Sequence, residues 1–182
     1  MDNNTTYGYW RVVARHCRYT IPEDLGRPSY VGDKECPENL NGLTIGQLIE
    51  LGQTEGGDAD YRITEIVLGF DRETTDKSRA VDVVSFLSWV GQQVKAINRL
   101  FEGVSHKPTA KERQAGVENL QFGLFGMIDW FAKRMGITDH DEVLRVPWLR
   151  IYKCMDMDNK TRQYEKRLNE ISLREAKGRK RK

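Results

Sequence analysis

Three side chains of the kind that bind zinc lie near the start of the chain: His16, Cys17 and Cys36. A structural zinc site takes four ligands, and no fourth follows at a usual spacing, since His140 and Cys154 are far along the chain. Three cysteines without a pairing pattern are typical of a reducing compartment. The sequence therefore predicts no metal site here.

Asp156 and Asp158 open a stretch that resembles a calcium-binding loop, in which oxygen ligands alternate along the chain. Lys160 occupies the third ligand position, and Thr161 stands where such a loop needs glycine. A helix is also predicted through the whole stretch, so we do not expect calcium to bind there.

Catalytic patterns are missing from the sequence. Gly56 and Gly57 form a glycine pair, but Glu55, Asp58 and Asp60 surround it and would repel the phosphate that a glycine loop binds. No Gly-x-Ser-x-Gly motif or other local pattern of an activated nucleophile occurs. We expect a protein that is not an enzyme, with no catalytic residue and no cofactor.

Residues 131–137 resemble the middle of a helix-turn-helix, with the small Ala132 four positions before the turn glycine Gly136. A recognition helix would need apolar anchors at the positions of Glu142 and Arg145, and its acidic start would repel phosphates. The sequence thus argues against a helix that reads a DNA groove.

Charge is unevenly distributed along the 182 residues, although the net charge is only +2. Residues 1–159 carry 19 basic and 24 acidic side chains, whereas residues 160–182 carry ten and three. The chain ends in a polybasic tail that contains Lys177, Arg179, Lys180, Arg181 and Lys182. Such a tail contacts phosphate, binds an acidic patch of a partner or only increases solubility, and the composition leaves all three open.

Apolar spacing predicts a mainly α fold of four to six helices, the last one long and basic. The clearest helix covers residues 75–102, where a stripe with spacings of 4, 3, 4, 3 and 4 consists of Val83, Leu87, Val90, Val94, Ile97 and Phe101. Thr44 and Gln47 form a capping box that begins an earlier helix, which Gly52 can end. Further helices are predicted over residues 60–68, 117–135 and 141–145, and from Pro147 onward.

The helix predicted over residues 117–135 has a core stripe of Val117, Leu120, Leu124, Met127 and Phe131. Gly123 and Gly126 within it predict a close backbone approach, which would offset their low helix propensity. Pro108 and alternating charges predict an exposed loop over residues 104–116.

Three regions follow from these patterns: an extended N-terminal arm (1–42), a helical domain (43–172) and a basic tail (173–182). The arm holds three of the five prolines, and its β-branched and aromatic residues predict a strand or short hairpin near residues 9–14.

The last helix carries two apolar patches with a polar gap between them. Trp148, Ile151, Tyr152 and Met155 share one face, and the next positions on that face are polar. Apolar residues resume with spacings of 4 and 3 at Tyr164, Leu168 and Ile171. We expect this second patch to be only partly buried in the isolated chain and to bind another subunit, whereas a solvated, fraying helix is the alternative.

Three stretches of the chain are similar to small proteins encoded in bacteriophage head and tail gene clusters: residues 43–51, residues 127–137 with 141–144 and Pro147-Trp148, and residues 152–168. The second stretch resembles tail assembly chaperones, in which an alanine-containing helix, a glycine turn and an acidic Glu-Val-Leu step precede a last helix. The resemblance covers about half of the chain and implies no catalytic residue. The arm of residues 1–42 departs from those chaperones, so a virion structural protein is implied equally.

We therefore expect non-enzymatic protein–protein interaction in bacteriophage particle assembly, in a homo- or hetero-oligomer, in the cytoplasm of a bacterial host or in the virion. The alternative is a small nucleic-acid-associated protein that binds phosphates through its basic end. The longest uncharged apolar stretch, residues 83–94, is 12 residues long, shorter than the ~20 that span a bilayer. The polar start lacks the basic region of a signal peptide. We expect neither a membrane span nor a signal peptide.

Overall fold

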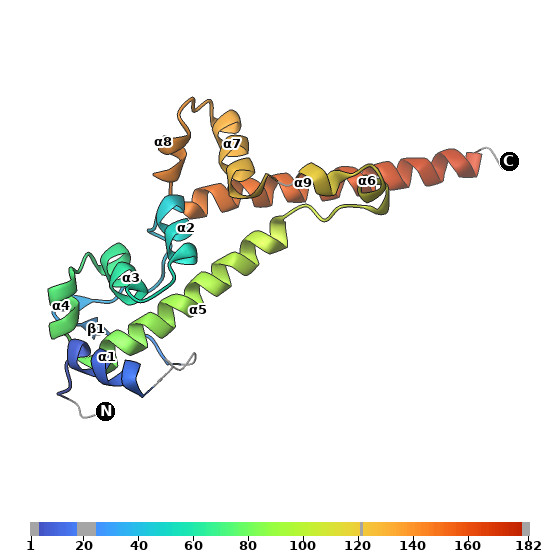
Figure 1. Cartoon of the computed structure of the whole chain (residues 1–182). Helices are drawn as coiled ribbons and strands as arrows, with labels where there is room; N and C mark the ends of the chain where they lie inside the picture. The colour runs from blue at the N-terminus through green and yellow to red at the C-terminus, as the bar shows by residue number, and fades with distance from the viewer. Residues whose placement is uncertain (1–3, 18–24, 121, 180–182) are drawn as a thin grey trace. The chain divides into compact units, whose positions relative to one another are not determined.

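The computed structural model describes residues 4–17, 25–120 and 122–179, with side chains as far as residue 177. The fold is mainly helical, as predicted, with a two-stranded sheet near the N-terminus and a long C-terminal helix (Figure 1). The chain forms two compact units. Unit 1 comprises Met1–Arg99 and Leu144–Trp148, and unit 2 comprises Leu100–Val143 and Leu149–Lys182. These divisions differ from the boundaries after residues 42 and 172 that the sequence predicts.

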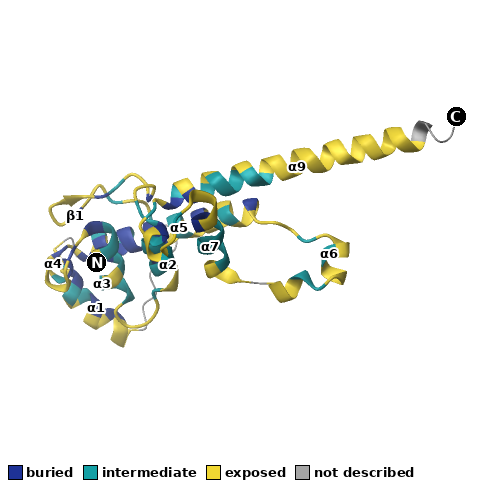
Figure 2. Ribbon diagram, turned by 90° about the horizontal axis from the view of Figure 1, so that it is seen from above, coloured by how far each residue is buried: buried dark blue, intermediate teal, exposed yellow. Residues whose placement is uncertain are grey.

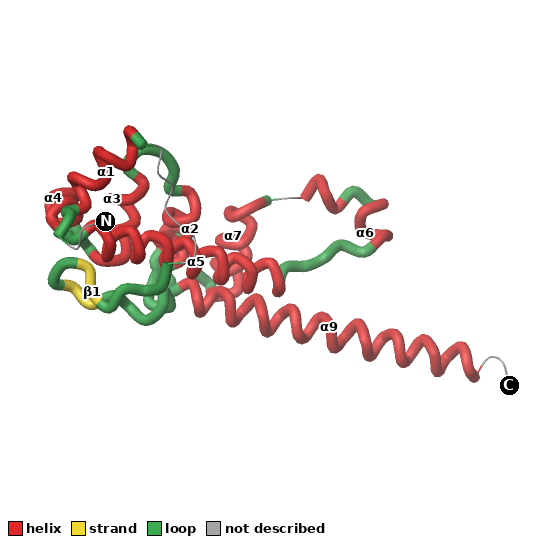
Figure 3. The backbone as a smooth tube through the Cα atoms, turned by 90° about the horizontal axis from the view of Figure 1, so that it is seen from below, coloured by secondary structure: helices red, strands yellow, loops and turns green. Residues whose placement is uncertain are grey.

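The described residues of unit 1 form four short helices, a hairpin and most of a long helix. Its elements are α1 (Tyr7–His16), β1 (Tyr30–Val31), β2 (Lys34–Glu35), α2 (Ile45–Gln53), α3 (Ala59–Leu68), α4 (Arg72–Lys77) and α5 (Ala80–Val104), the last of which continues into unit 2. The strands are antiparallel, with Tyr30 opposite Glu35 and Val31 opposite Lys34 (Figure 3).

The segment predicted as a strand near residues 9–14 is the helix α1. Its buried residues Tyr7, Arg11 and Ala14 follow the i, i+4, i+7 spacing of one helix face. The aromatic and β-branched residues that suggested a strand lie on the exposed face: Tyr9, Val12 and Val13. Tertiary burial of one face thus overrides local β propensity.

The start of the chain is joined to unit 1 by backbone hydrogen bonds. The Tyr7 N–H donates to the Ser78 carbonyl at 2.8 Å, and the Ala80 N–H donates to the Thr5 carbonyl at 2.8 Å. Val31 and Leu40 are also buried. Residues 1–42 therefore include parts of the unit 1 core, and where they are described they do not form an arm that is extended throughout.

Helix boundaries in unit 1 follow local sequence closely. Thr44 and Gln47 form the predicted capping box of α2, although the helix continues past Gly52 to Gln53. Gly69 ends α3 in the left-handed conformation at φ 69°, as expected for glycine after a helix. The long helix predicted to begin at residue 75 begins at Ala80 instead, because residues 72–77 form the separate helix α4, whose Asp71 cap accepts a hydrogen bond from the Thr74 N–H.

Helix α5 carries the main apolar stripe of the protein. Val83, Leu87, Val90 and Ile97 are buried, whereas Val94 and Phe101 are partly exposed. Neighbouring Val84, Phe86 and Trp89 are buried as well, so the covered face is wider than the predicted stripe in the first half of the helix.

Residues 144–148 return to unit 1 after the chain has passed through unit 2. Thr44 and Pro147 form an antiparallel bridge, and the Ile45 N–H donates to the Val146 carbonyl at 2.8 Å. The Trp148 indole is buried and donates to the Leu40 carbonyl at 2.8 Å. A Cβ on Gly46 would lie 2.8 Å from the Leu144 carbonyl oxygen, so this contact needs glycine.

Unit 2 contains the end of α5, α6 (Ala110–Gln114), the 3-10 helix η1 (Val117–Leu120), α7 (Gly123–Met135), most of α8 (His140–Leu144) and α9 (Trp148–Arg179) after its first residue. Helix α6 lies in the predicted loop and has its own capping box of Thr109 and Glu112. The single helix predicted over residues 117–135 is two elements.

The two glycines of that predicted helix have different roles. Gly123 begins α7 with φ 53°, and a Cβ added there would have no atom within 4 Å. Glycine is therefore favoured at this position by its backbone conformation and not by close packing. At Gly126 a Cβ would lie 2.8 Å from the Cβ of Phe122, the N-cap residue of the same helix, so the close contact is with a neighbouring side chain and not the backbone approach that was predicted.

Candidate functional site

A buried arginine joins α1 to α3 in unit 1. The side chain of Arg11 is 10% exposed, and its Nε donates to Asp60 Oδ2 at 2.5 Å. Its Nη2 lies 3.0 Å from Asp58 Oδ1 and also donates to the Gly57 carbonyl. The guanidinium carbon lies 4.3 Å from the centre of the Tyr61 ring. Gly57 of the glycine pair thus accepts a hydrogen bond from an arginine through its carbonyl oxygen, in keeping with the acidic residues around it.

Two tyrosine hydroxyls complete this cluster. Tyr7 donates to Asp60 Oδ2 at 2.6 Å, and Tyr61 donates to Asp76 Oδ1 at 2.6 Å. Burial, followed by the hydrogen bond to Asp60, raises the pKa of Tyr7 far above its usual value. Burial and the bond to Asp76 raise the pKa of Tyr61. Both hydroxyls therefore stay protonated at neutral pH, and the cluster fixes α1 in place.

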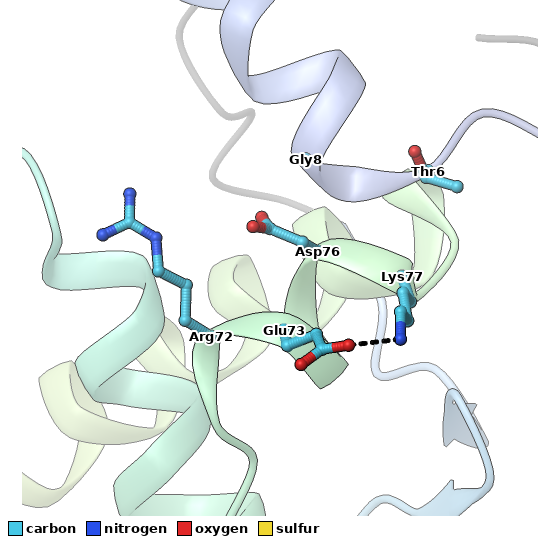
Figure 4. Close-up of a pocket in the computed structure, with 6 residues that line it drawn as sticks. All are labelled: Thr6, Gly8, Arg72, Glu73, Asp76 and Lys77. Atoms are coloured by element: carbon cyan, nitrogen blue, oxygen red, sulfur yellow. Dashed lines mark hydrogen bonds and ion pairs between the residues drawn. The ribbon is translucent and has the colours of Figure 1, made fainter.

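A shallow hollow lies beside the cluster, between α1 and α4 (Figure 4). Its lining residues are Thr6, Gly8, Arg72, Glu73, Asp76 and Lys77. Lys77 Nζ lies 2.5 Å from Glu73 Oε1, as Figure 4 shows, and Asp76 accepts the Tyr61 hydrogen bond. Two cations and two carboxylates line the hollow, and Arg72 lies 3.8 Å from Asp58, so the hollow offers no concentrated charge for a ligand.

The predicted partner-binding residues lie in the second half of α9. Tyr164, Leu168 and Ile171 are 59%, 47% and 53% exposed. Every side chain from residue 160 to residue 177 is exposed, as the yellow end of α9 in Figure 2 shows. The structure thus places the three residues together on an uncovered helix, as expected for the isolated chain, and their contact with another subunit stays a prediction.

The first half of α9 is covered. Trp148 and Ile151 are buried, and Tyr152 and Met155 are partly exposed. In unit 2 the Phe101 and Tyr152 rings are 5.8 Å apart, and Arg134 Nη1 lies 2.6 Å from Asp158 Oδ1. The polar gap that the sequence shows after Met155 therefore coincides with the change from covered to exposed helix.

The basic end of the chain is described only in part. Lys177 is exposed near the end of α9, and Arg179 is the last residue of that helix. Lys180, Arg181 and Lys182 lie outside the described residues, as does the side chain of Arg179. Phosphate or acidic-partner contact by these five residues stays a prediction.

The carboxylates of the calcium-like stretch are ion-paired. Asp156 Oδ2 lies 2.7 Å from Lys160 Nζ, and Asp158 pairs with Arg134. Cys17, Cys36 and Cys154 are free thiols, and Cys36 is buried. No group of three or more metal-ligating side chains occurs among residues 4–17, 25–120 and 122–179.

One exposed apolar surface was not predicted from the sequence. The stripe predicted as core places Leu120 and Leu124 inside, yet they are 62% and 47% exposed, and Phe122 and Phe125 are 67% and 59% exposed. Leu124 lies seven positions before the buried Phe131 in α7, on the same helix face, so the first turn of that face is exposed while its later part is covered. Four large apolar residues within six positions are the pattern that could have indicated it, because a single helix face cannot hold them all.

Among the described residues, no helix is long and apolar enough to cross a membrane. Comparison with protein-family models, with curated proteins and with solved structures gives no match to this chain.

Proposed function

We propose that the chain is a non-enzymatic protein-interaction subunit that binds other protein through the second half of α9. One observation carries this proposal: residues 160–177 continue α9 with every side chain exposed, although large apolar side chains recur on that stretch. At 1.5 Å per residue this stretch is roughly 26 Å long. Most of the stability of helices in proteins comes from packing of an apolar face, and this stretch has no covered face.

The setting that we propose is bacteriophage particle assembly, as a tail assembly chaperone or a virion structural component. This proposal is supported by the resemblance of residues 43–51, 127–137 and 152–168 to small proteins encoded in bacteriophage head and tail gene clusters. The proposed location is the bacterial cytoplasm or the assembled virion.

A second candidate function is phosphate binding by the basic end, which the ten basic and three acidic residues of segment 160–182 favour. Ionic strength separates the two functions. Phosphate contacts weaken steeply between about 50 and 200 mM salt, whereas contacts through apolar side chains do not.

Photocrosslinking in infected or expressing cells tests the proposal. A photoreactive amino acid at Leu168 is expected to give protein adducts, and the same amino acid at the similarly exposed Leu173, five positions further along α9, gives few. Both positions are exposed, so the pair controls for accessibility. Adducts with nucleic acid alone, or equal protein adducts at both positions, would contradict the proposal.

A further inference from the structure

The exposed part of α9 carries a regular apolar seam. Met157, Thr161, Tyr164, Leu168 and Ile171 follow one another with spacings of 4, 3, 4 and 3. All five side chains are exposed. This is the a/d spacing at which two helices pack along their whole length in a coiled coil, with Thr161 and Leu168 at a and Tyr164 and Ile171 at d. The fifth large apolar residue of the stretch, Leu173, falls at position f and points away from the seam.

We propose that this seam binds the same seam of a second copy of the chain, as a parallel two-stranded coiled coil in register. The inference rests on the proposed function, because it names the partner for the surface assigned there. Its particular support is the distribution of charge beside the seam.

In a parallel pair, each g residue faces the e residue five positions later on the partner helix. Lys160 stands at g and Glu165 at e, so two copies form this opposite-charge pair twice, once on each side of the seam. Arg167 at g faces the neutral Ser172 at e. Arg174 at g faces Arg179 at e, so like charges meet only at the last turn of the helix.

An antiparallel pair brings g residues beside g residues. Lys160, Arg167 and Arg174 occupy the g positions, so every such contact between two copies joins two cations. The charge pattern therefore selects the parallel arrangement over the antiparallel one. Lys160 pairs with Asp156 of its own helix at 2.7 Å, but its side chain is 73% exposed and remains accessible to a second copy.

Parallel pairing also brings two basic chain ends together beyond the seam. Their repulsion opposes association and is screened by salt, since the Debye length is ~10 Å at 0.1 M. Self-association through the seam should therefore tighten as salt increases, the opposite of phosphate binding.

Sedimentation velocity of the full chain tests the pairing. We expect a concentration-dependent dimer that tightens between about 50 and 500 mM salt. Leu168→Asp should weaken dimerisation by more than about tenfold, because it places a charge in the seam. Leu173→Asp carries the same change at an exposed position outside the seam and should leave the dimer unchanged. Both replaced residues are exposed, so circular dichroism should show the same folded core in both variants.

Disulfide trapping tests the orientation. In a background with the exposed Cys17 replaced by serine, Ile171→Cys should form a disulfide-linked dimer under mild oxidation, because in-register d residues face each other. Leu173→Cys in the same background should not.

A chain that stays monomeric at all concentrations and salt conditions would overturn the inference, as would equal effects of the two aspartate variants. Absence of an Ile171 disulfide in a chain that does dimerise would overturn the parallel register. Crosslinks from Leu168 to a different protein in cells, with a monomeric chain in solution, would overturn the second copy as partner and leave the proposed function standing. A chain that is monomeric in solution and gives no protein crosslinks from Leu168 in cells would refute both the pairing of two copies and the proposed function.

Discussion

Helices α5 and α9 carry the same apolar spacing but differ in what covers it. The α5 stripe and the α9 seam both alternate spacings of 4 and 3. Unit 1 buries Val83, Leu87 and Val90 of α5, whereas Tyr164 and Leu168 of α9 are exposed. Periodicity thus identifies a helix face that needs cover, but it does not say whether the same chain supplies the cover.

The flanking residues distinguish the two helices better than the spacing does. Covered Val83–Val90 lies in a stretch with no charged residue between Asp82 and Lys95. The α9 seam is bordered by Lys160, Glu165 and Arg167. A wide uncharged face fits a chain's own core, and a narrow seam with charged borders fits a second helix.

The largest expected difference between the two helices is in stability. Leu87→Ala should lower the free energy of unfolding by about 2–4 kcal/mol, through lost burial and the cavity left behind. Leu168→Ala should change it by less than about 0.5 kcal/mol in the monomer, because the side chain is already exposed. Chemical denaturation at a protein concentration below that of self-association measures both. Similar losses would mean that α9 is covered within the chain.

Tyrosines sharpen the contrast, because Tyr7 is 1% exposed and Tyr164 is 59% exposed. Tyr7→Phe removes a hydrogen bond to the Asp60 carboxylate and should cost about 1.5–3 kcal/mol at neutral pH. Tyr164→Phe should cost almost nothing.

Alkaline pH adds a second measurement on the same pair. The folded chain holds the pKa of Tyr7 above the usual value of 10.0. As pH rises above about 10, the unfolded chain loses this proton while the folded chain keeps it, so the free energy of unfolding decreases. Denaturation midpoints between about pH 9 and 11 should fall less steeply in Tyr7→Phe than in the parent chain. Equal slopes would show that the Tyr7 hydroxyl is not held in its protonated form.

Alanine substitutions at two helix glycines should change the free energy of unfolding by smaller amounts and in opposite directions. Gly46→Ala should destabilise by about 1–3 kcal/mol, because the new Cβ meets the Leu144 backbone. Gly91 in α5 has no atom within 4 Å of a Cβ position, so Gly91→Ala should stabilise by about 0.5–1 kcal/mol through helix propensity. Thermal melts of both variants give the sign directly, and stabilisation by Gly46→Ala would mean that residues 144–148 do not dock on α2.

The smallest effect is expected at the end of the chain. Deletion of residues 176–182 should leave helicity and the melting temperature of the monomer unchanged, since Ala176 and Lys177 are exposed. The same deletion should strengthen self-association at low salt, because it removes repelling charge. A melting temperature lower by several degrees would show that the tail stabilises the folded monomer.

Local sequence accounts for the elements whose boundaries depend on near neighbours. The Thr44–Gln47 capping box and the αL glycine Gly69 each depend on residues within one or two helical turns. The stripe of α5 is predicted by a spacing that repeats every two turns. The last helix and its exposed second patch were also predicted, since the polar gap after Met155 is local.

Features that depend on distant partners were not predicted. Helix α1 is stabilised by the hydrogen bond from Arg11 to Asp60, which is 49 positions away. No local sequence pattern predicts that pair. Leu120 in η1 and Leu124 in the first turn of α7 are likewise exposed, although their spacing fitted a core helix. Local propensity indicates which segments can be helical, and tertiary partners decide which face is covered.

The docking of residues 144–148 has a consequence for synthesis on the ribosome. Translation proceeds from the N-terminus, so residues 1–99 emerge well before Trp148, which the first unit buries and bonds to Leu40. A nascent chain that has not yet reached Trp148 leaves the Leu40 carbonyl without this donor and the surrounding apolar side chains without the indole. The first unit therefore reaches its final core only after the intervening segment 100–143 has been made. Any truncation upstream of Trp148 should yield a protease-sensitive product, however much of the first unit it contains.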